Sequence, residues 1–281
     1  MKKSENYGRG RDKFRPKKSF GQNFLKNPRV IQKIIDTAGL TGSELVVEVG
    51  PGFGILTEAL TARARHVIAI EKDNYLFTHL KEKFKNTKNL ELIHGDALKI
   101  PPPKSPYFLV ANIPYSITSP LLDHFIRENP NGISGLPTRA VLLVQKEVAQ
   151  KICAQPPHMN VLALHVQTFG KPKIIATVSR HNFKPTPKVD SAIIKIEFNV
   201  IAQQAVIAIP TLRRGKQSGL DYAKYFNLIH RGFSQKRKML RALLPLELLK
   251  KAGIDPTRRA ETLTIDEWQK LSPNTDSPPI S

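Results

Sequence analysis

The tetrapeptide Asn112-Ile113-Pro114-Tyr115 combines residue types that could activate an amino group on a planar base. The lone pair of such a nitrogen is delocalised into the ring, so it is a weak nucleophile. The side-chain amide of Asn112 and the backbone carbonyl of Ile113 can each accept one N–H and favour a more pyramidal, reactive nitrogen. Pro114 would hold that carbonyl in place, and Tyr115 could stack on a base taken out of its helix or loop. The motif therefore predicts methyl transfer to adenine N6 in RNA, with no metal and no covalent intermediate.

A binding site for an adenosine-containing cofactor is indicated by groups at three successive predicted strand ends. Gly50 and Gly52 follow the first strand, where glycines let a ligand approach the backbone. Glu71 comes about 20 residues later and could accept ribose hydroxyls. Asp96 follows the next strand and could accept an adenine amino group. Together with the tetrapeptide, this order predicts S-adenosylmethionine as the cofactor, with Asn112 also bordering it.

Other interpretations of these motifs compete when each is taken alone. A dinucleotide-binding loop requires Gly or Ala three positions after Gly52, where Ile55 stands, so hydride transfer is disfavoured. Glu71 and Asp96 could simply cap the helices that follow them. The tetrapeptide could be an ordinary turn, because Asn and Pro are common in loops. The complete order of the four elements favours the methyltransferase interpretation.

The elements that must position these groups alternate between strand-like and helix-like patterns. Short β-branched runs are found at 45–49, 67–70, 90–93, 108–111 and 140–144, and most are separated by helical stretches. A further helical stretch, at 30–40, precedes the first of these runs. This alternation predicts a parallel, doubly wound α/β sheet. Two more strands are expected at 174–178 and 191–198, on either side of a proline-rich loop at 183–187. The expected fold class is α/β, a Rossmann-like class I methyltransferase sheet with a small C-terminal α-helical domain.

Composition along the chain suggests four segments. We expect a basic flexible arm at 1–18, a methyltransferase domain that binds S-adenosylmethionine at 19–200, a helical RNA-binding domain at 201–271 and a disordered tail at 272–281. A helix is predicted over 222–244, with a basic content that includes Lys236, Arg237 and Arg241. Its basic residues are expected to contact phosphates, and a solvated helix face is the alternative.

The bulk composition points to a polyanionic partner. Lys and Arg outnumber Asp and Glu by 44 to 23 among 281 residues, which gives a formal net charge of +21. Such an excess favours nucleic acid, although it could also serve only to solubilise the surface. The one cysteine, Cys153, cannot form an internal disulfide, and the histidines show no spacing typical of metal ligands. With no apolar run of signal-peptide or membrane-spanning length, a cytoplasmic protein is expected, although the composition of 1–18 also allows an organellar transit peptide.

These motifs resemble those of the ribosomal RNA adenine N6,N6-dimethyltransferases, in particular the enzymes of the small-subunit (16S) type. The resemblance extends over about 19–270. The segments that carry it are Ser-Phe-Gly-Gln-Asn-Phe-Leu at 19–25, Glu-Val-Gly-Pro-Gly at 48–52, Asn-Ile-Pro-Tyr-Ser-Ile-Thr-Ser-Pro at 112–120, Gln-Lys-Glu-Val-Ala at 145–149, Phe-Lys-Pro-Thr-Pro-Lys-Val-Asp-Ser at 183–191 and Phe-Ser-Gln-Lys-Arg-Lys at 233–238. Residues 156–162 depart from the Tyr-Gly-x-Leu-Ser stretch of the family and look shortened, so substrate contacts there cannot be carried over.

The resemblance implies further site residues and a substrate. Asn23 and Leu25 would close over S-adenosylmethionine, and Phe183 would lie against the target adenine opposite Tyr115, in a stacked sandwich. The implied reaction is dimethylation of two adjacent adenosines in a 3′-terminal hairpin of small-subunit rRNA, within an immature small ribosomal subunit and by a monomer.

Two other functions remain open from the sequence. A macrolide-resistance enzyme that methylates large-subunit (23S) rRNA would share the tetrapeptide, but the segments at 253–256 and 258–261 are more similar to the small-subunit enzymes. A non-catalytic RNA-binding assembly or transcription factor could keep the same fold. The intact Asn112 and cofactor motif argue against loss of catalysis.

Overall fold

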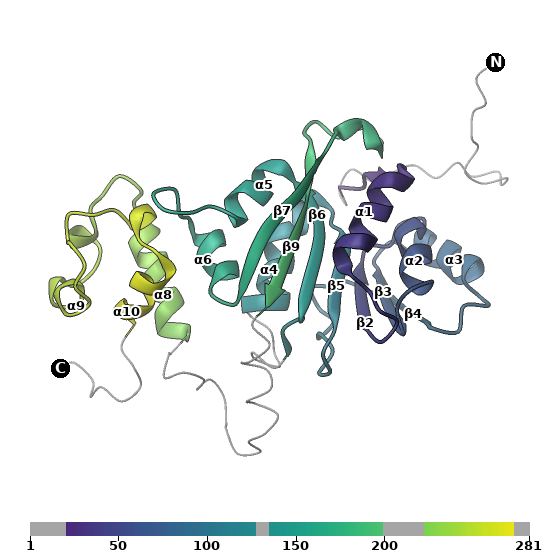
Figure 1. The fold of residues 1–281 in the computed structure, drawn as a ribbon, viewed down its shortest axis with the longest axis horizontal. Coiled ribbons are helices and arrows are strands. Elements are labelled where there is room, and N and C mark those ends of the chain that lie inside the picture. The colour runs from purple at the N-terminus through teal and green to yellow at the C-terminus, as the bar shows by residue number, and fades with distance from the viewer. Residues whose placement is uncertain (1–20, 128–134, 199–221, 273–281) are drawn as a thin grey trace.

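A central sheet of seven strands organises the protein, with strand order β4-β3-β2-β5-β6-β9-β7 (Figure 1). The computed structural model describes residues 21–127, 135–198 and 222–272. The expected arm at 1–18 and the expected domain boundary near 200 lie outside these residues, as do residues 273–281 of the tail expected at 272–281. Among the helices that are described, none is long and apolar enough to span a membrane.

All seven strands of this sheet were expected from the sequence, and the five from which a parallel sheet was predicted are parallel. The parallel strands are β2 (Leu45–Val49), β3 (His66–Glu71), β4 (Leu90–His94), β5 (Phe108–Asn112) and β6 (Arg139–Gln145). The last two, β7 (Gly170–Val178) and β9 (Ser191–Phe198), run antiparallel to each other, and β9 runs antiparallel to β6. Strand β7 therefore runs in the same direction as β2 to β6, and within this sheet β9 is the reversed strand, because the β7–β9 connection contains no crossover helix that would bring the chain back to run parallel.

Helices cover both faces of the sheet, as the doubly wound prediction required. The helices are α1 (Pro28–Ala38), α2 (Ile55–Thr61), α3 (Asn74–Lys83), α4 (Thr118–Leu122), α5 (Lys146–Ile152), α6 (Val161–Gln167), α8 (Tyr222–Phe233), α9 (Leu246–Lys251) and α10 (Ile265–Leu271). Val46 packs into a core with α1 and α2, whereas Val47 packs into the core on the opposite face. This alternation follows from the two-residue period of a strand, and it makes the sheet the common wall of two cores.

Helix α1 shows why its ends fall where they do. Asn27 caps the N-terminus by accepting a hydrogen bond from the backbone N–H of Arg29, and Pro28 occupies the first turn, where no N–H is needed. Gly39 ends the helix in the left-handed conformation, with φ of 61°. The helix therefore begins two residues before the expected start at Val30.

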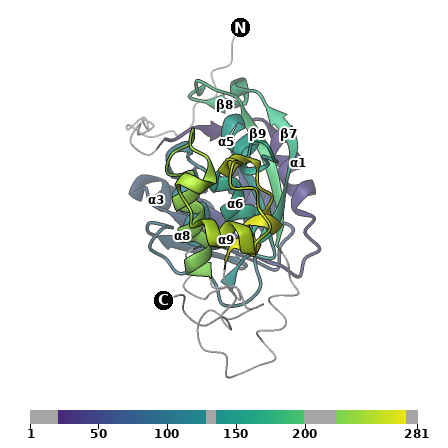
Figure 2. The ribbon, with the colours of Figure 1, turned by 90° about the vertical axis from the view of Figure 1, so that its left-hand side faces the viewer.

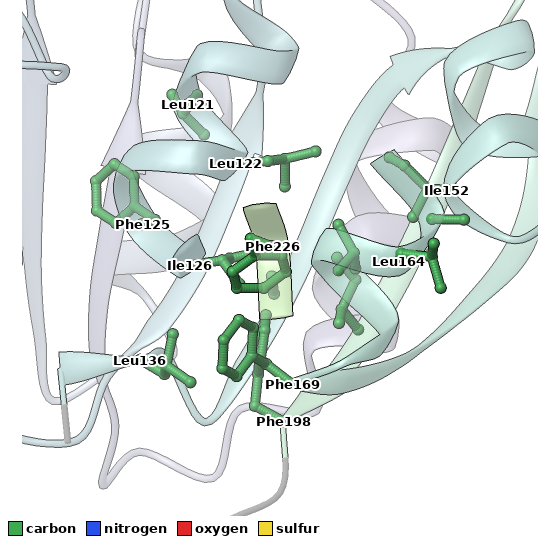
Figure 3. Packing of buried hydrophobic residues seen from close by; sticks show 14 of the residues in the cluster. Leu121, Leu122, Phe125, Ile126, Leu136, Ile152, Leu164, Phe169, Phe198 and Phe226 are labelled. Carbon is green, nitrogen blue, oxygen red and sulfur yellow. The ribbon is translucent and has the colours of Figure 1, made fainter. Parts of the chain in front are cut away.

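The C-terminal helices share one of these cores with the sheet. In Figure 3, Phe226 of α8 lies close to Ile126 and Phe169, and the ring centroids of Phe226 and Phe169 are 5.9 Å apart in the core that also contains Leu164 of α6. The hydroxyl of Tyr225 lies 3.1 Å from that of Thr168, which follows α6. Seen from that end of the molecule, α8 and α9 lie in front of α6 (Figure 2). The C-terminal part is thus packed against the core on this face of the central sheet.

The prediction of one helix over 222–244 is wrong, because α8 ends at Phe233. Gly232 lies so close to Trp268 of α10 that an added Cβ would stand 2.5 Å from the indole ring. Just beyond it, the hydroxyl of Ser234 donates to the carbonyl of Arg231 and closes the last turn. The basic residues that follow, 236–238, lie in turns, and a short 3-10 helix η6 (Leu240–Ala242) comes next.

The segment that departs from the family pattern, 156–162, has a defined structural role. Asn160 caps α6 by accepting a hydrogen bond from the N–H of Ala163 at 3.0 Å. Met159 is buried, and its N–H donates to the carbonyl of Glu261 at 3.0 Å. The segment therefore links α6 to the C-terminal helices.

Candidate active site

A cavity opens at the carboxyl edge of β2, β3, β4 and β5, where an open α/β sheet binds its ligand. Six of the seven residues predicted to bind the cofactor line it, namely Asn23, Leu25, Gly50, Glu71, Asp96 and Asn112. The remaining members of the tetrapeptide, Ile113, Pro114 and Tyr115, line it as well. The structure therefore brings together groups that are separated by up to about 90 residues in the chain.

Gly52 is the predicted cofactor residue that does not line the cavity. Its N–H donates to Oε2 of Glu71 at 3.1 Å, so Gly52 helps to hold the Glu71 carboxylate in the cavity wall. Its φ of 62° is left-handed, and an added Cβ would stand 3.0 Å from the ring of Phe24. Both features require glycine, because an L side chain would be strained and crowded there.

Glu71 is held by backbone donors on both carboxylate oxygens. Oε2 accepts from Gly52, and Oε1 accepts from the N–H of Asp73 at 2.8 Å. Burial raises the pKa of Glu71. The alternative that Glu71 caps the next helix is wrong, because Asp73 is the N-cap of α3 and accepts from Tyr75 and Leu76. Glu71 therefore retains oxygen lone pairs on the cavity side.

Asp96 lies at the next strand end and is paired with a cation. The ammonium of Lys72 lies 2.9 Å from Oδ2, and this contact lowers the pKa of Asp96. Oδ1 accepts the N–H of Leu98 at 3.1 Å, so Asp96 also stabilises the turn after β4. The carboxylate is thus ionised and fixed in orientation. Lys72, which the sequence did not single out, also lines the cavity.

Glu48 is a third acidic residue of the cavity lining, and the sequence placed it only within the glycine motif. It is 1% exposed, and burial raises its pKa to about 8. Among the described residues, no donor lies within hydrogen-bond distance of its Oε2. Glu48 is therefore largely protonated and uncharged at neutral pH.

The two acceptors expected from Asn112 and Ile113 are both available. The amide nitrogen of Asn112 donates to the carbonyl of Asn23 at 3.3 Å, which directs Oδ1 away from that segment. The N–H of Ile113 donates to the carbonyl of Leu143 at 3.2 Å. Within the described part of the chain, no group donates to Oδ1 of Asn112 or to the carbonyl of Ile113. Two oxygen acceptors are thus left for an incoming amino group.

Tyr115 begins the short helix η2 (Tyr115–Ile117), which the carbonyl of Pro114 closes by accepting from Ile117 at 3.1 Å. The Tyr115 hydroxyl lies 2.7 Å from Oγ of Ser191, a fully buried residue at the start of β9. Partial burial raises the pKa of Tyr115. One edge of the ring is therefore anchored to the sheet while the residue still borders the cavity.

Phe183 lies away from the cavity lining. It belongs to the two-residue strand β8 (Phe183–Lys184), which pairs with β1 (Phe24–Leu25), and its side chain is 1% exposed in a core that includes Leu25. Its expected stacking on the target base stays a prediction. Neither Asn23 nor Phe183 was found from the residues alone, because two-residue strands leave no periodic signal in the sequence.

The sheet carries groups suited to bind an adenosine-containing cofactor at successive strand ends, and two oxygen acceptors for an amino group lie beside them. This arrangement defines a Rossmann-like methyltransferase. A family model described as ribosomal RNA adenine dimethylase matches residues 13–275. The chain belongs to the ribosomal RNA adenine dimethylase family.

Similar proteins agree with this assignment. The chain is 41% identical over 272 residues to a ribosomal RNA small subunit methyltransferase A of Dehalococcoides mccartyi, covering 92% of this chain and 87% of the relative. It is 37% identical to a protein of the same name from Clostridium botulinum, covering 92% of this chain and 94% of the relative. Among solved structures, a dimethyladenosine transferase from Plasmodium falciparum is similar with a TM-score of 0.72 and 29% identity, over 88% of this chain and 95% of the other. The 23S rRNA methyltransferase ErmE is similar with a TM-score of 0.68 and 29% identity, over 89% and 98%.

Proposed function

We propose that this protein uses S-adenosylmethionine to dimethylate N6 of two adjacent adenosines in a 3′-terminal hairpin of small-subunit (16S) rRNA, during small-subunit biogenesis. The observation that carries the proposal is the pair of available hydrogen-bond acceptors, Oδ1 of Asn112 and the carbonyl of Ile113. They lie beside a cavity lined by groups suited to bind an adenosine-containing cofactor. The names of the curated relatives support the small subunit as the substrate. We expect the enzyme to act as a monomer in the cytoplasm.

S-adenosylmethionine fits the chemistry of the cavity. Glu71 has lone pairs left to accept ribose hydroxyls, and the ionised Asp96 can accept an adenine amino group. Gly50 lines the cavity with no side chain in the way, while Asn23 and Leu25 border it from the N-terminal segment. When bound, the cofactor supplies a methyl group on a positively charged sulfur.

The protein's own residues would then act on the target amino group. Oδ1 of Asn112 and the carbonyl of Ile113 each accept one N–H of an unmethylated adenine, which draws the nitrogen lone pair out of conjugation. The nitrogen releases one proton to solvent after the first transfer and keeps a single N–H, so the second transfer needs only one acceptor. Tyr115 offers an aromatic face to the flipped base, and its anchor on Ser191 fixes the plane of the ring.

The test is methylation of immature small ribosomal subunits by the purified protein with labelled cofactor. We expect mass spectrometry of digested RNA to show N6,N6-dimethyladenosine in the small-subunit rRNA and none with the Asn112→Ala variant. Methylation of large-subunit rRNA instead would overturn the substrate assignment and favour the ErmE-like reaction. RNA binding without any transfer would favour a non-catalytic assembly factor.

A further inference from the structure

A second hollow lies beside the candidate active site, where three loops meet at the same end of the sheet. It is lined by residues after β6, by residues after β7 and by residues that lead into β9: Lys146, Glu147, Gln150, Ser179, Arg180, His181, Lys188, Val189 and Asp190. The last two groups come from the β7–β9 connection (Figure 1). Part of this hollow is formed by residues 188–190 of the motif at 183–191, to which the proposed chemistry gives no role.

The hollow is close to the groups that would act on the target base. In the sheet, Asn112 is paired with Leu143, and two residues further along β6, Gln145 is paired with Ser191. Neighbouring strands are about 4.8 Å apart, and the Ser191 hydroxyl lies 2.7 Å from that of Tyr115. Lys146 directly follows Gln145 and Asp190 directly precedes Ser191, so both adjoin the strand ends next to the tetrapeptide.

The charge of the hollow is positive and is only partly neutralised. Lys146 and Lys188 are exposed, and neither ammonium forms an ion pair or hydrogen bond with any described residue. The carboxylate of Glu147 is occupied by Lys151 at 2.6 Å. The ammonium groups of Lys146 and Lys188 thus border a hollow with two acidic residues, of which Glu147 is already paired.

The loops that carry these cations are tied together by Asp190. Its carboxylate accepts the N–H of Arg180 at 3.0 Å, and its carbonyl accepts the N–H of Lys146 at 3.0 Å. The guanidinium of Arg180 donates to the carbonyl of Lys188 at 3.1 Å. The shape of the hollow is therefore built by the protein and does not depend on a ligand.

An exposed apolar side chain stands among these charges. Val189 is 45% exposed, next to Lys188. Cations beside an apolar contact suit a nucleotide, which has an anionic phosphate joined to an apolar sugar and base face. The formal net charge of +21 points to the same kind of partner.

We infer that this hollow binds the phosphates of the RNA strand that flanks the target adenosine, with Lys146 and Lys188 as the phosphate contacts and Val189 against the adjoining nucleotide. The inference rests on the proposed function, since it takes RNA as the substrate. Phosphate contacts fix the register of a bound strand, whereas base contacts select the base. The hollow would thus place the flanking backbone so that one adenosine reaches the acceptor pair of Asn112 and Ile113.

The test compares two doubly substituted proteins that lose the same charge. In Lys146→Gln/Lys188→Gln both phosphate contacts are removed. The matched control is Lys88→Gln/Lys104→Gln, which removes two exposed lysines before β4 and β5, at the opposite edge of the sheet. The probe is a fluorescent RNA hairpin with two adjacent adenosines in its loop, and anisotropy gives its Kd over a range of salt concentrations.

We expect the first variant to raise Kd roughly 10-fold at physiological salt and to lower the slope of log Kd against log salt by about 1 to 1.5. The control should change Kd less than about twofold, and it should lower the slope by less than the amount expected for the loss of one phosphate contact. Replacing the phosphates beside the adenosines with neutral methylphosphonates should weaken binding to the wild type and leave the variant unaffected. Equal Kd values and slopes for the two variants would overturn the inference.

Two further outcomes separate this inference from its alternatives. If the variant binds the hairpin normally but loses affinity for intact small subunits, the hollow contacts a ribosomal protein and the inference is wrong. If the wild type fails to methylate small subunits while the hairpin results hold, the proposed substrate is wrong but the phosphate site stands. Thermal unfolding of both variants at the wild-type temperature would exclude misfolding as the cause.

Discussion

Nδ2 of Asn112 donates a hydrogen bond to the backbone carbonyl of Asn23 across 3.3 Å. This contact joins the candidate catalytic amide at the end of β5 to the N-terminal segment that borders the cofactor cavity. Because the amide nitrogen is used in this way, its oxygen is the atom left to receive an amino group. The N-terminal segment therefore orients the acceptor on which methyl transfer would depend.

Substitution of Asn112 should separate chemistry from binding. Asn112→Ala removes the acceptor, and we expect kcat to fall by roughly 100-fold or more, a size typical for loss of one polar group in a reaction centre. Asn112→Asp keeps an oxygen acceptor but loses the donor to the carbonyl of Asn23, so its kcat should fall less while the KM for the cofactor rises. Steady-state kinetics give both values, and hairpin binding should be unchanged in each variant. Loss of RNA affinity in Asn112→Ala would assign this residue a structural role.

The contact between Tyr115 and Ser191 should show coupling in a double-mutant cycle. Tyr115→Phe and Ser191→Ala each remove one side of the 2.7 Å hydrogen bond, and each should lower the free energy of unfolding by about 1 kcal/mol. The double variant should lose no more than the larger single loss, because the second change removes nothing that remains. Urea denaturation measures all three. Additive losses would mean that the two hydroxyls do not stabilise each other.

Asp96 should contribute to cofactor affinity through its ionised carboxylate. Asp96→Asn keeps the shape but removes the charge, and we expect the Kd for S-adenosylmethionine to rise by roughly 10-fold. Lys72→Gln removes the partner of the carboxylate while leaving the carboxylate in place, so it should change Kd less. Isothermal titration calorimetry measures both. A larger effect of Lys72→Gln than of Asp96→Asn would assign cofactor recognition to the lysine.

How far the sequence predicted this structure depends on the length of each pattern. The runs at 45–49 and 191–198 form strands with those bounds, because each is rich in apolar or β-branched residues and is largely buried within the sheet. The strand β8 was missed because two residues cannot show a period. The helix expected over 222–244 failed for a different reason: Leu240 and Leu244 are buried at helix-like spacing, but in a 3-10 turn and the residues after it.

The candidate site was predictable to the extent that it depends on strand ends. Gly50, Glu71, Asp96 and Asn112 lie on one edge because parallel strands bring their carboxyl ends together. Asn23 reaches the cavity through an N-terminal segment whose path no periodicity encodes, and only the family resemblance indicated it. Glu48 was hidden for another reason, since its raised pKa results from burial that the sequence does not display.

Glu48 should make the stability of the protein depend on pH. Its pKa rises from 4.5 in the unfolded chain to about 8 in the folded one, so the folded state holds the proton more tightly. Below pH 4.5 both states are protonated and the group costs nothing. As pH rises from 4.5 towards 8 the unfolded state ionises first, so the cost to stability grows, and it levels off above 8. Glu48→Gln cannot ionise and should remove this cost, which we expect to raise the free energy of unfolding at pH 8 by roughly 1–3 kcal/mol.

The measurement is urea denaturation of wild type and Glu48→Gln at pH 5 and pH 8, without cofactor. The gain in the variant should be small at pH 5 and clear at pH 8. The matched control is Glu247→Gln, which removes an exposed carboxylate in the first turn of α9 and should change stability little at either pH. An equal gain for Glu48→Gln at both pH values would mean that folding does not raise the pKa of Glu48. A loss of stability at pH 8 would mean that the Glu48 carboxylate is stabilised by its surroundings, contrary to the raised pKa.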